Sequence, residues 1–151
     1  MNKVLIILAS ISVFIIIAFF VLGMMSKKGE ALGLKEGQLQ ACTSIENCVV
    51  SEVINGEPNT IEAFTFSGDK TEFVDKLEGV IETLGGKVTV QEGDYIAATF
   101  TSKIFGYVDD FELRVSDNNL LHFRSASRVG RSDLGANKKR VDAMKLLLSQ
   151  Q

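Results

Sequence analysis

The sequence comprises 151 residues, of which 46% are hydrophobic and 23% are charged, with a net charge of -3 and two cysteines. The charge is uneven, because residues 1–123 carry 9 Lys/Arg against 17 Asp/Glu, whereas residues 124–151 carry 7 against 2. This acidic body argues against nucleic acid as a partner, since phosphate binding usually requires a basic excess over a whole domain.

The first predicted element is an apolar helix at residues 4–25. This run of 22 residues contains no charge and is followed by Lys27 and Lys28. As a helix it would be about 33 Å long, which matches a hydrocarbon core of about 30 Å. We therefore expect an uncleaved transmembrane helix through which the chain binds the membrane. The alternative is a cleaved signal peptide, although the apolar region of such a peptide usually has only about 7 to 15 residues.

Two features bear on the orientation of this helix. Two positive charges precede the apolar run and three lysines follow it within ten residues, so the positive-inside rule leans weakly towards a cytoplasmic domain. Cysteine usage favours the opposite. The chain has only two cysteines, Cys42 and Cys48, and one histidine, His122. A zinc site usually needs four such ligands, so a short disulfide loop between the cysteines is favoured. A disulfide requires an oxidising compartment. We expect a single-pass protein of the cell membrane with its C-terminal domain outside the cytoplasm, in the periplasm.

Residues 26–41 mix Lys, Glu, Gly and Gln without periodicity and predict a juxtamembrane linker. At its end, Leu39-Gln40-Ala41-Cys42 is similar to the end of a bacterial lipoprotein signal. That segment begins 14 residues after the apolar run, beyond three lysines, so lipidation of Cys42 is the less favoured alternative. Residues 42–151 then predict a single domain.

The domain begins with a short predicted strand at 61–66, which follows Pro58, the only proline. Asp69 and Glu72 have the spacing of a capping box at a helix start. Apolar residues then recur at helical spacing until Gly85-Gly86, which predicts the end of the helix.

Further along the chain the period changes to two, which predicts strands at 87–91, 95–104, 108–115 and 120–127. The turn at Asp117-Asn118-Asn119 sets a register in which Leu113 lies opposite Phe123, Glu112 opposite Arg124 and Arg114 opposite His122. A last helix is predicted from about residue 137, with Val141, Met144, Leu147 and Leu148 on its buried side. This order predicts an α+β fold, an antiparallel sheet of about five strands with two helices on one face.

The connection between the last strand and the last helix, residues 124–140, carries the candidate binding site. Its arginines and serines lie beside a helix N-terminus, whose free N–H groups attract a phosphate or carboxylate. Together with two aspartates of the preceding strand, the candidate binding residues are Asp109, Asp110, Arg124, Ser125, Ser127, Arg128, Ser132, Asp133, Asn137 and Arg140. The alternative is a structural role, in which Arg124 and Arg128 pair with acidic residues of the neighbouring strand while Asp133 or Asn137 caps the helix.

Several of these segments resemble an uncharacterised family, domain of unknown function 1499. The residues concerned are Phe100-Thr101-Ser102, Val108-Asp109-Asp110 and, above all, 124–140. The family's pattern Cys-Pro-x-x-Pro-Asn-Cys-Val-Ser-Ser is similar to residues 42–51. This chain keeps Cys42, Asn47, Cys48, Val49 and Ser51 but has Thr43 and Glu46 in place of the prolines. The resemblance spans residues 42–148 and implies an exported or membrane-facing domain. It implies no reaction.

No catalytic residue, metal site or cofactor motif is predicted. Asp109 and Asp110 are neighbours on a strand and point to opposite faces, so they cannot form a carboxylate dyad. His122 faces away from Ser125, which leaves no nucleophile beside a base. No phosphate loop or dinucleotide fingerprint is present. We expect a binding or assembly module for an envelope protein or an anionic ligand. The alternatives are a hydrolase or transferase acting on envelope lipid or glycan, with Ser127 or Asp110 at its centre, and a purely structural envelope protein.

Overall fold

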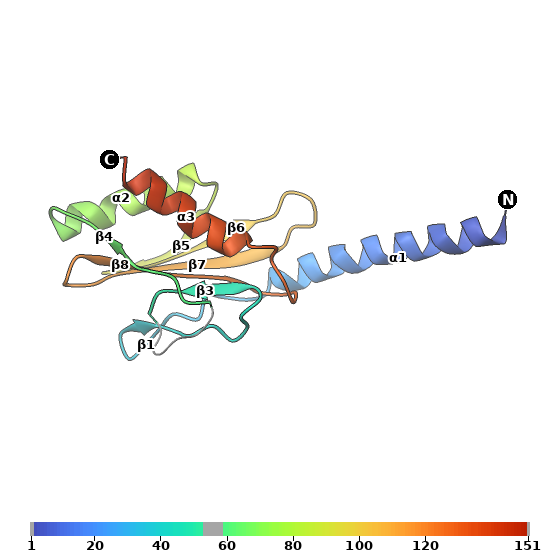
Figure 1. The fold of residues 1–151 in the computed structure, drawn as a ribbon, viewed down its shortest axis with the longest axis horizontal. Coiled ribbons are helices and arrows are strands. Elements are labelled where there is room, and N and C mark those ends of the chain that lie inside the picture. Colours follow the sequence, from blue (N-terminus) through green and yellow to red (C-terminus); the bar gives the residue numbers. More distant parts are fainter. Residues whose placement is uncertain (1, 53–58, 151) are drawn as a thin grey trace.

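The computed structural model describes residues 2–52 and 59–150. Figure 1 shows a long helix, α1, that projects from one end of a layered domain. The elements are α1 (Lys3–Ser26), β1 (Leu34–Lys35), β2 (Gln38–Leu39), β3 (Cys48–Val50), β4 (Phe64–Thr65), α2 (Lys70–Thr83), β5 (Lys87–Glu92), β6 (Tyr95–Thr101), β7 (Val108–Val115), β8 (Leu120–Ser127) and α3 (Ala136–Leu148). Pro58, expected just before the first strand, lies outside the described residues.

The helix α1 covers the apolar segment expected at residues 4–25 and extends it by one residue at each end. By length and composition it is able to cross a membrane, and a signal sequence near the N-terminus can have the same length and composition. Its side chains are exposed over most of its length, and only Gly23 and Ser26 near its end are buried. The helix therefore contacts the domain through its C-terminal turns alone.

Six strands form one sheet in the order β3-β8-β7-β6-β5, and β4 also pairs with β8. All the strand pairs are antiparallel. The expected α+β class with an antiparallel sheet is therefore confirmed. This sheet contains one strand that was not expected, β3. It has only three residues, too few to produce a recognisable alternation in the sequence.

The predicted register of the central hairpin is confirmed. Leu113 lies opposite Phe123, Glu112 opposite Arg124 and Arg114 opposite His122. The turn is closed by a hydrogen bond of 2.9 Å from the backbone N–H of Ser116 to the carbonyl of Leu120. Because side chains alternate along a strand, this register fixes which side chains of β7 and β8 share a face of the sheet.

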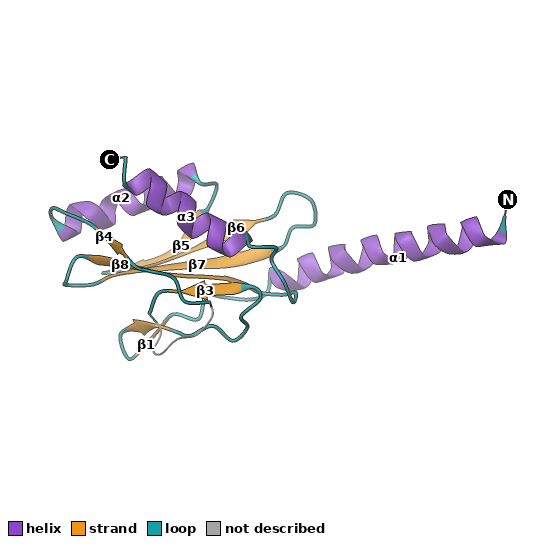
Figure 2. Ribbon diagram, in the orientation of Figure 1, coloured by secondary structure: helices purple, strands orange, loops and turns teal. Residues whose placement is uncertain are grey.

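One face of the sheet is covered by α2 and α3 (Figure 2). Asp69 caps α2 as expected, since its side chain accepts hydrogen bonds from the N–H groups of Thr71 and Glu72. The core between helices and sheet is apolar and includes Val74, Leu77, Ile81, Ile96, Phe111, Leu113, Phe123, Val141 and Met144. Burial of this apolar surface stabilises the domain and fixes both helices against the strands.

The opposite face of the sheet is covered by the segment that follows α1. Within residues 26–41, expected as a linker, β1 and β2 form a hairpin whose turn residues Glu36 and Gly37 have φ values of 54° and 77°. Two positive φ values are typical of a two-residue hairpin turn. Leu39 from this hairpin is buried with Val50, Tyr95 and Ala97. The sheet is therefore covered on both faces.

Two predicted strands are shorter in the structure. The strand expected at 95–104 ends at Thr101, because a tight loop follows in which Ser102 Oγ accepts a hydrogen bond of 2.9 Å from the Tyr107 N–H. Ile104, the last residue of the expected strand, is 74% exposed in this loop. The strand expected at 61–66 is reduced to Phe64–Thr65, where it pairs with the start of β8.

Candidate functional site

The candidate residues of β7 and β8 are divided between the two faces of the sheet. Asp109, opposite Ser127 in the register, points towards the helices, as does Ser125. Their neighbours Asp110 and Arg124 point to the other face, as alternation along a strand requires. The candidate residues of β7 and β8 therefore do not form one site. They belong to two separate polar clusters, one on each face of the sheet.

The cluster on the helix side joins the sheet to α3. Ser125 Oγ donates a hydrogen bond of 2.6 Å to Asn137 Oδ1 and accepts one of 2.8 Å from Arg140 Nη1. Arg140 also pairs with Asp109 at 2.8 Å, and Asn137 Nδ2 donates to Ser127 Oγ at 3.1 Å. Ser125 and Asn137 are fully buried. These hydrogen bonds satisfy the polar groups that the packing of α3 removes from water.

The N-terminus of α3 is occupied by a carboxylate of the chain itself. Asp133 accepts hydrogen bonds of 2.9 Å from the N–H of Gly135 and 2.8 Å from the N–H of Asn137. Gly135, with a φ of 79°, is the N-cap residue and provides no side chain. Two of the N–H groups at this terminus, where the sequence suggested an external anion, are thus bound by the Asp133 carboxylate. Ser132 is exposed beside this turn.

The cluster on the opposite face is centred on Glu112, whose side chain is fully buried. Its carboxylate accepts hydrogen bonds of 2.6 Å from Arg124, 2.9 Å from the Tyr95 hydroxyl and 2.9 Å from the backbone N–H of Gly33. Burial of the phenol, together with the negative charge of Glu112, raises the pKa of Tyr95 well above its ordinary value. The Tyr95 hydroxyl therefore remains protonated as a hydrogen-bond donor, and Gly33 ties the hairpin segment to the sheet.

Arg128 connects this face of the sheet to α1. Its Nε and Nη2 donate to the two oxygens of Asp110 at 2.9 and 2.6 Å, and its Nη1 donates to the Ser26 carbonyl at 3.2 Å. The Ser26 hydroxyl accepts a further hydrogen bond of 2.9 Å from the N–H of Val108. A bidentate pair of this kind is both strong and directional. It fixes the last turn of α1 against the start of β7.

A third group on this face consists of Glu52, Arg114 and His122. Arg114 binds both oxygens of Glu52, and His122 Nε2 lies 3.8 Å from that carboxylate. Burial opposes ionisation of Glu52, but the hydrogen bonds from Arg114 and the Leu39 N–H and the nearby positive charges hold its pKa below the ordinary value. Burial lowers the pKa of His122, and the positive charge of Arg114 lowers it further. The negative charge of Glu52 raises this pKa, but the net shift is downwards.

The loop closed by the Cys42–Cys48 disulfide packs against the candidate site. Asn47 in this loop donates a hydrogen bond of 2.6 Å to the carbonyl of Gly130, and its own carbonyl accepts from Asn137 Nδ2 at 2.9 Å. The backbone N–H of Ser127 donates to the same carbonyl at 2.9 Å. The disulfide loop and the β8–α3 connection are therefore one unit.

A pocket of about 670 Å³ lies where α1, the β6–β7 loop and the β8–α3 connection meet. Four candidate residues line it, namely Asp109, Ser127, Ser132 and Asp133. Its apolar lining includes Phe19, Leu22, Ile104, Phe105, Val129 and Leu134. Figure 1 shows both loops at the end of the domain from which α1 projects.

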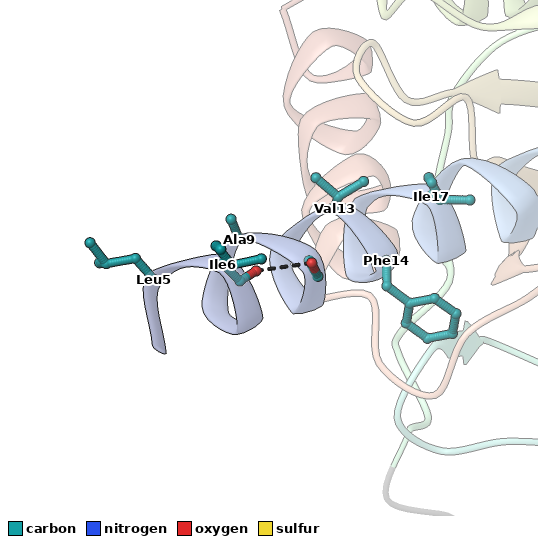
Figure 3. A pocket seen from close by; sticks show the side chains of 7 residues that line it. Leu5, Ile6, Ala9, Val13, Phe14 and Ile17 are labelled. Carbon is teal, nitrogen blue, oxygen red and sulfur yellow. Dashed lines mark hydrogen bonds between the residues drawn. The ribbon is translucent and has the colours of Figure 1, made fainter. Parts of the chain in front are cut away.

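A second space, of about 650 Å³, is a shallow groove along the N-terminal half of α1 (Figure 3). All of its lining residues belong to α1 and most are aliphatic or aromatic. Its one polar side chain is Ser10, whose hydroxyl donates to the carbonyl of Ile6 at 2.9 Å within the helix. The groove therefore offers a ligand a single polar group, whose donor is already used within the helix.

The structure does not place Ser125 or Ser127 beside the imidazole. His122 points to the face of Glu52, whereas these two serines are bound to α3 on the other face. The hydroxyl beside His122 is that of Ser51, 3.4 Å from Nδ1, and it also accepts a hydrogen bond of 2.8 Å from the backbone N–H of Phe123. Within residues 2–52 and 59–150, no three His, Cys, Asp or Glu side chains are placed to hold a metal ion.

Several residues of the site region were not identified from the sequence. Ser26 was expected in a linker, and Ile104 in a strand. Phe105 packs on Phe19 and Phe20 with ring centroids 5.2 and 5.3 Å apart. Leu134 is 87% exposed. The sequence does carry a signal for the β6–β7 loop. Ile104 and Phe105 are two adjacent large apolar residues directly before Gly106, which is unusual in a turn.

The chain was compared with known proteins by three routes. The family model for the protein of unknown function DUF1499 matches residues 38–148. The comparisons with curated proteins and with solved structures gave no match. The matched region extends from β2 to the end of α3 and includes the disulfide loop, both polar clusters and the β8–α3 connection. The chain therefore belongs to the DUF1499 family.

Proposed function

We propose that this chain is a single-pass membrane protein whose α+β domain lies outside the cytoplasm and acts as a binding or assembly module. In this proposal α1 is the membrane span and the pocket beside its C-terminal end is the binding site. The ligand is a partner protein of the envelope or an anionic molecule.

The location is supported by the Cys42–Cys48 disulfide and by the length of α1. Disulfides persist in oxidising compartments and are rare in the cytoplasm. A helix of 24 residues is about 36 Å long, which is sufficient for a hydrocarbon core of about 30 Å. An uncleaved span would leave the domain next to the membrane surface.

The observation that carries the proposal is that the pocket brings four candidate residues to an accessible space. The candidate arginines are less suited to a ligand, because Arg124, Arg128 and Arg140 are already paired with Glu112, Asp110 and Asp109. Ser132 and Arg131, by contrast, are exposed at the pocket. The binding surface is therefore assigned to the pocket rather than to the three paired arginines.

Photocrosslinking in intact cells tests this proposal. A photoreactive amino acid at Ser132 should give a specific adduct of defined mass, whereas the same group at Leu146 should not. Leu146 is a suitable control because it is exposed on α3 and does not line the pocket. Equal yields at the two positions, or no adduct at either, would contradict a binding role for the pocket.

A purely structural role is the second candidate. It is favoured by the three ion pairs of Arg124, Arg128 and Arg140, of which the Arg124–Glu112 pair is fully buried and the other two are largely buried. In that case Arg128 and Asp133 matter only for stability. Changes at exposed pocket residues such as Ser132 and Leu134 would then leave both folding and cellular phenotype intact. Loss of the phenotype in a variant with unchanged thermal stability would favour binding instead.

A further inference from the structure

We propose that the pocket between α1 and the two loops holds an acyl chain of a phospholipid from the membrane that α1 spans. The inference rests on the proposed membrane span and names the ligand of the proposed binding site. The β6–β7 loop and the β8–α3 connection would then lie at the boundary between lipid headgroups and hydrocarbon.

The position of Phe105 along α1 sets the depth of the pocket. Phe105 packs on Phe19 and Phe20, and Phe19 precedes the end of α1 at Ser26 by seven residues. At 1.5 Å per residue, this places Phe105 about 10 Å back along the helix from its end. Lys27 and Lys28 follow directly and belong at the headgroups. The tip of the β6–β7 loop is therefore level with the apolar part of α1.

The contact between loop and helix is close. A Cβ atom added at Gly23 would overlap the backbone carbonyl of Phe105, so only glycine allows the loop to approach α1 in this way. The loop is also closed by its own hydrogen bonds, since the N–H of Ser102 donates to the Tyr107 carbonyl at 2.8 Å and the N–H of Gly106 donates to the Ser102 carbonyl at 3.2 Å. Backbone groups paired in this way are suited to a region with little water.

The lining of the pocket matches an acyl chain. Ile104 is 74% exposed and Leu134 is 87% exposed, and they come from different loops. Together with Phe19 and Leu22 they form an apolar surface that no other element among the described residues covers. Such surfaces mark sites of contact with a membrane or partner. Because two of these residues belong to α1, the surface is continuous with the proposed span.

The charged residues of the pocket suit a phosphate at its mouth. Lys103 has no ion-pair partner among the described residues, and the side chain of Arg131 is 88% exposed although it pairs with Glu46. Asp109 is paired with Arg140, and Asp133 caps α3. The lining carboxylates are thus already bound. Lys103 is available to a lipid phosphate, and Arg131 can exchange its exposed pair with Glu46 for one.

Depth-dependent fluorescence quenching tests the inference. The chain contains no tryptophan, so Ile104→Trp and Leu134→Trp each introduce a single probe at an exposed pocket position. The full-length variants are reconstituted into phospholipid vesicles whose acyl chains carry bromine at defined depths. Phe14→Trp, within α1, reports on the span itself. Leu146→Trp, at an exposed position of α3, is the aqueous control.

The expected result is that the Ile104→Trp and Leu134→Trp variants emit at shorter wavelength than the Leu146→Trp variant. Bromine near the headgroup end of the acyl chain should also quench these two pocket probes several-fold more strongly than the control. Quenching of the Phe14→Trp probe alone, with the two pocket probes indistinguishable from the Leu146→Trp probe, would overturn the acyl-chain site and leave the span intact. Absence of quenching in the Phe14→Trp variant would overturn the span and, with it, this inference.

Discussion

Arg128 and Ser26 are 102 residues apart in the sequence and are joined by a hydrogen bond of 3.2 Å from the guanidinium to the backbone carbonyl. The same guanidinium binds both oxygens of Asp110, a buried residue of β7. The last turn of α1 is therefore bound directly to the start of β7, a central strand of the sheet. This arrangement explains why the β8–α3 connection is rich in polar residues even though most of them are not available to a ligand.

Replacement of Arg128 should strongly destabilise the domain. Arg128→Ala leaves the buried Asp110 carboxylate without its partner, which is expected to lower the free energy of unfolding by about 3 to 5 kcal/mol. Denaturant unfolding of the full-length protein in detergent measures the change. Arg131→Ala is the matched control, because its pair with Glu46 is exposed and should cost less than about 1 kcal/mol. Similar effects of both substitutions would refute the bridging role of Arg128.

The approach of the β6–β7 loop to α1 should depend on Gly23. Gly23→Ala places a Cβ against the Phe105 carbonyl and should lower the free energy of unfolding by about 1 to 3 kcal/mol through overpacking. Gly79→Ala is the control within α2, since its Cβ would meet no atom within 4 Å. That substitution should stabilise the protein by about 0.8 to 1 kcal/mol, the difference in helix propensity. Melting temperatures that shift in opposite directions are expected, and a shift in the same direction would contradict the close contact.

The cap of α3 should depend on Asp133. Asp133→Ala removes the acceptor of two backbone N–H groups, and a loss of about 1 kcal/mol is typical of a missing cap. Asp142→Ala, which removes only an exposed pair with Lys138 four residues earlier, should cost about 0.3 to 0.5 kcal/mol. Unfolding curves that rank the two variants in the reverse order would show that Asp133 is not the principal cap.

Stability should decrease in mildly acidic solution because of His122. Burial lowers the pKa of this imidazole below its ordinary value of 6.5, so the unfolded chain binds the proton more tightly than the folded one. The free energy of unfolding should then fall as the pH decreases from 6.5 towards the pKa of folded His122. Measurements of unfolding between about pH 7.5 and pH 5 should show this slope, which His122→Gln should remove.

A separate loss is expected at lower pH. The pKa of Glu52 lies below its ordinary value of 4.5, so its pair with Arg114 contributes stability above that pH and loses it as the pH falls through the folded pKa. This second decrease should persist in His122→Gln. If the free energy of unfolding of His122→Gln depends on pH near pH 6 as steeply as that of the natural protein, a group other than His122 titrates there.

Much of the domain could be predicted because its long elements have clear periodicity. The register of β7 and β8 follows from the turn between them, and Asp69 marks the start of α2. The elements that were not predicted are short or depend on distant contacts. Nothing in the local sequence indicates that Gly33 donates to Glu112, or that residues 26–41 cover a face of the sheet. The same limit applies to the candidate site. The residue types of 124–140 suggested one anionic site, but strand alternation separates Ser125 from Arg124.

Thiol labelling in intact cells with a membrane-impermeant reagent shows whether the domain lies outside the cytoplasm. Cys48→Ser is the positive control, because it leaves Cys42, which is half-buried, as a free thiol. For a domain outside the cytoplasm, we expect the natural protein to be labelled only after reduction by an impermeant reductant and Cys48→Ser to be labelled without it. Free thiols that react only after the membrane is broken, in both proteins, would place the domain in the cytoplasm.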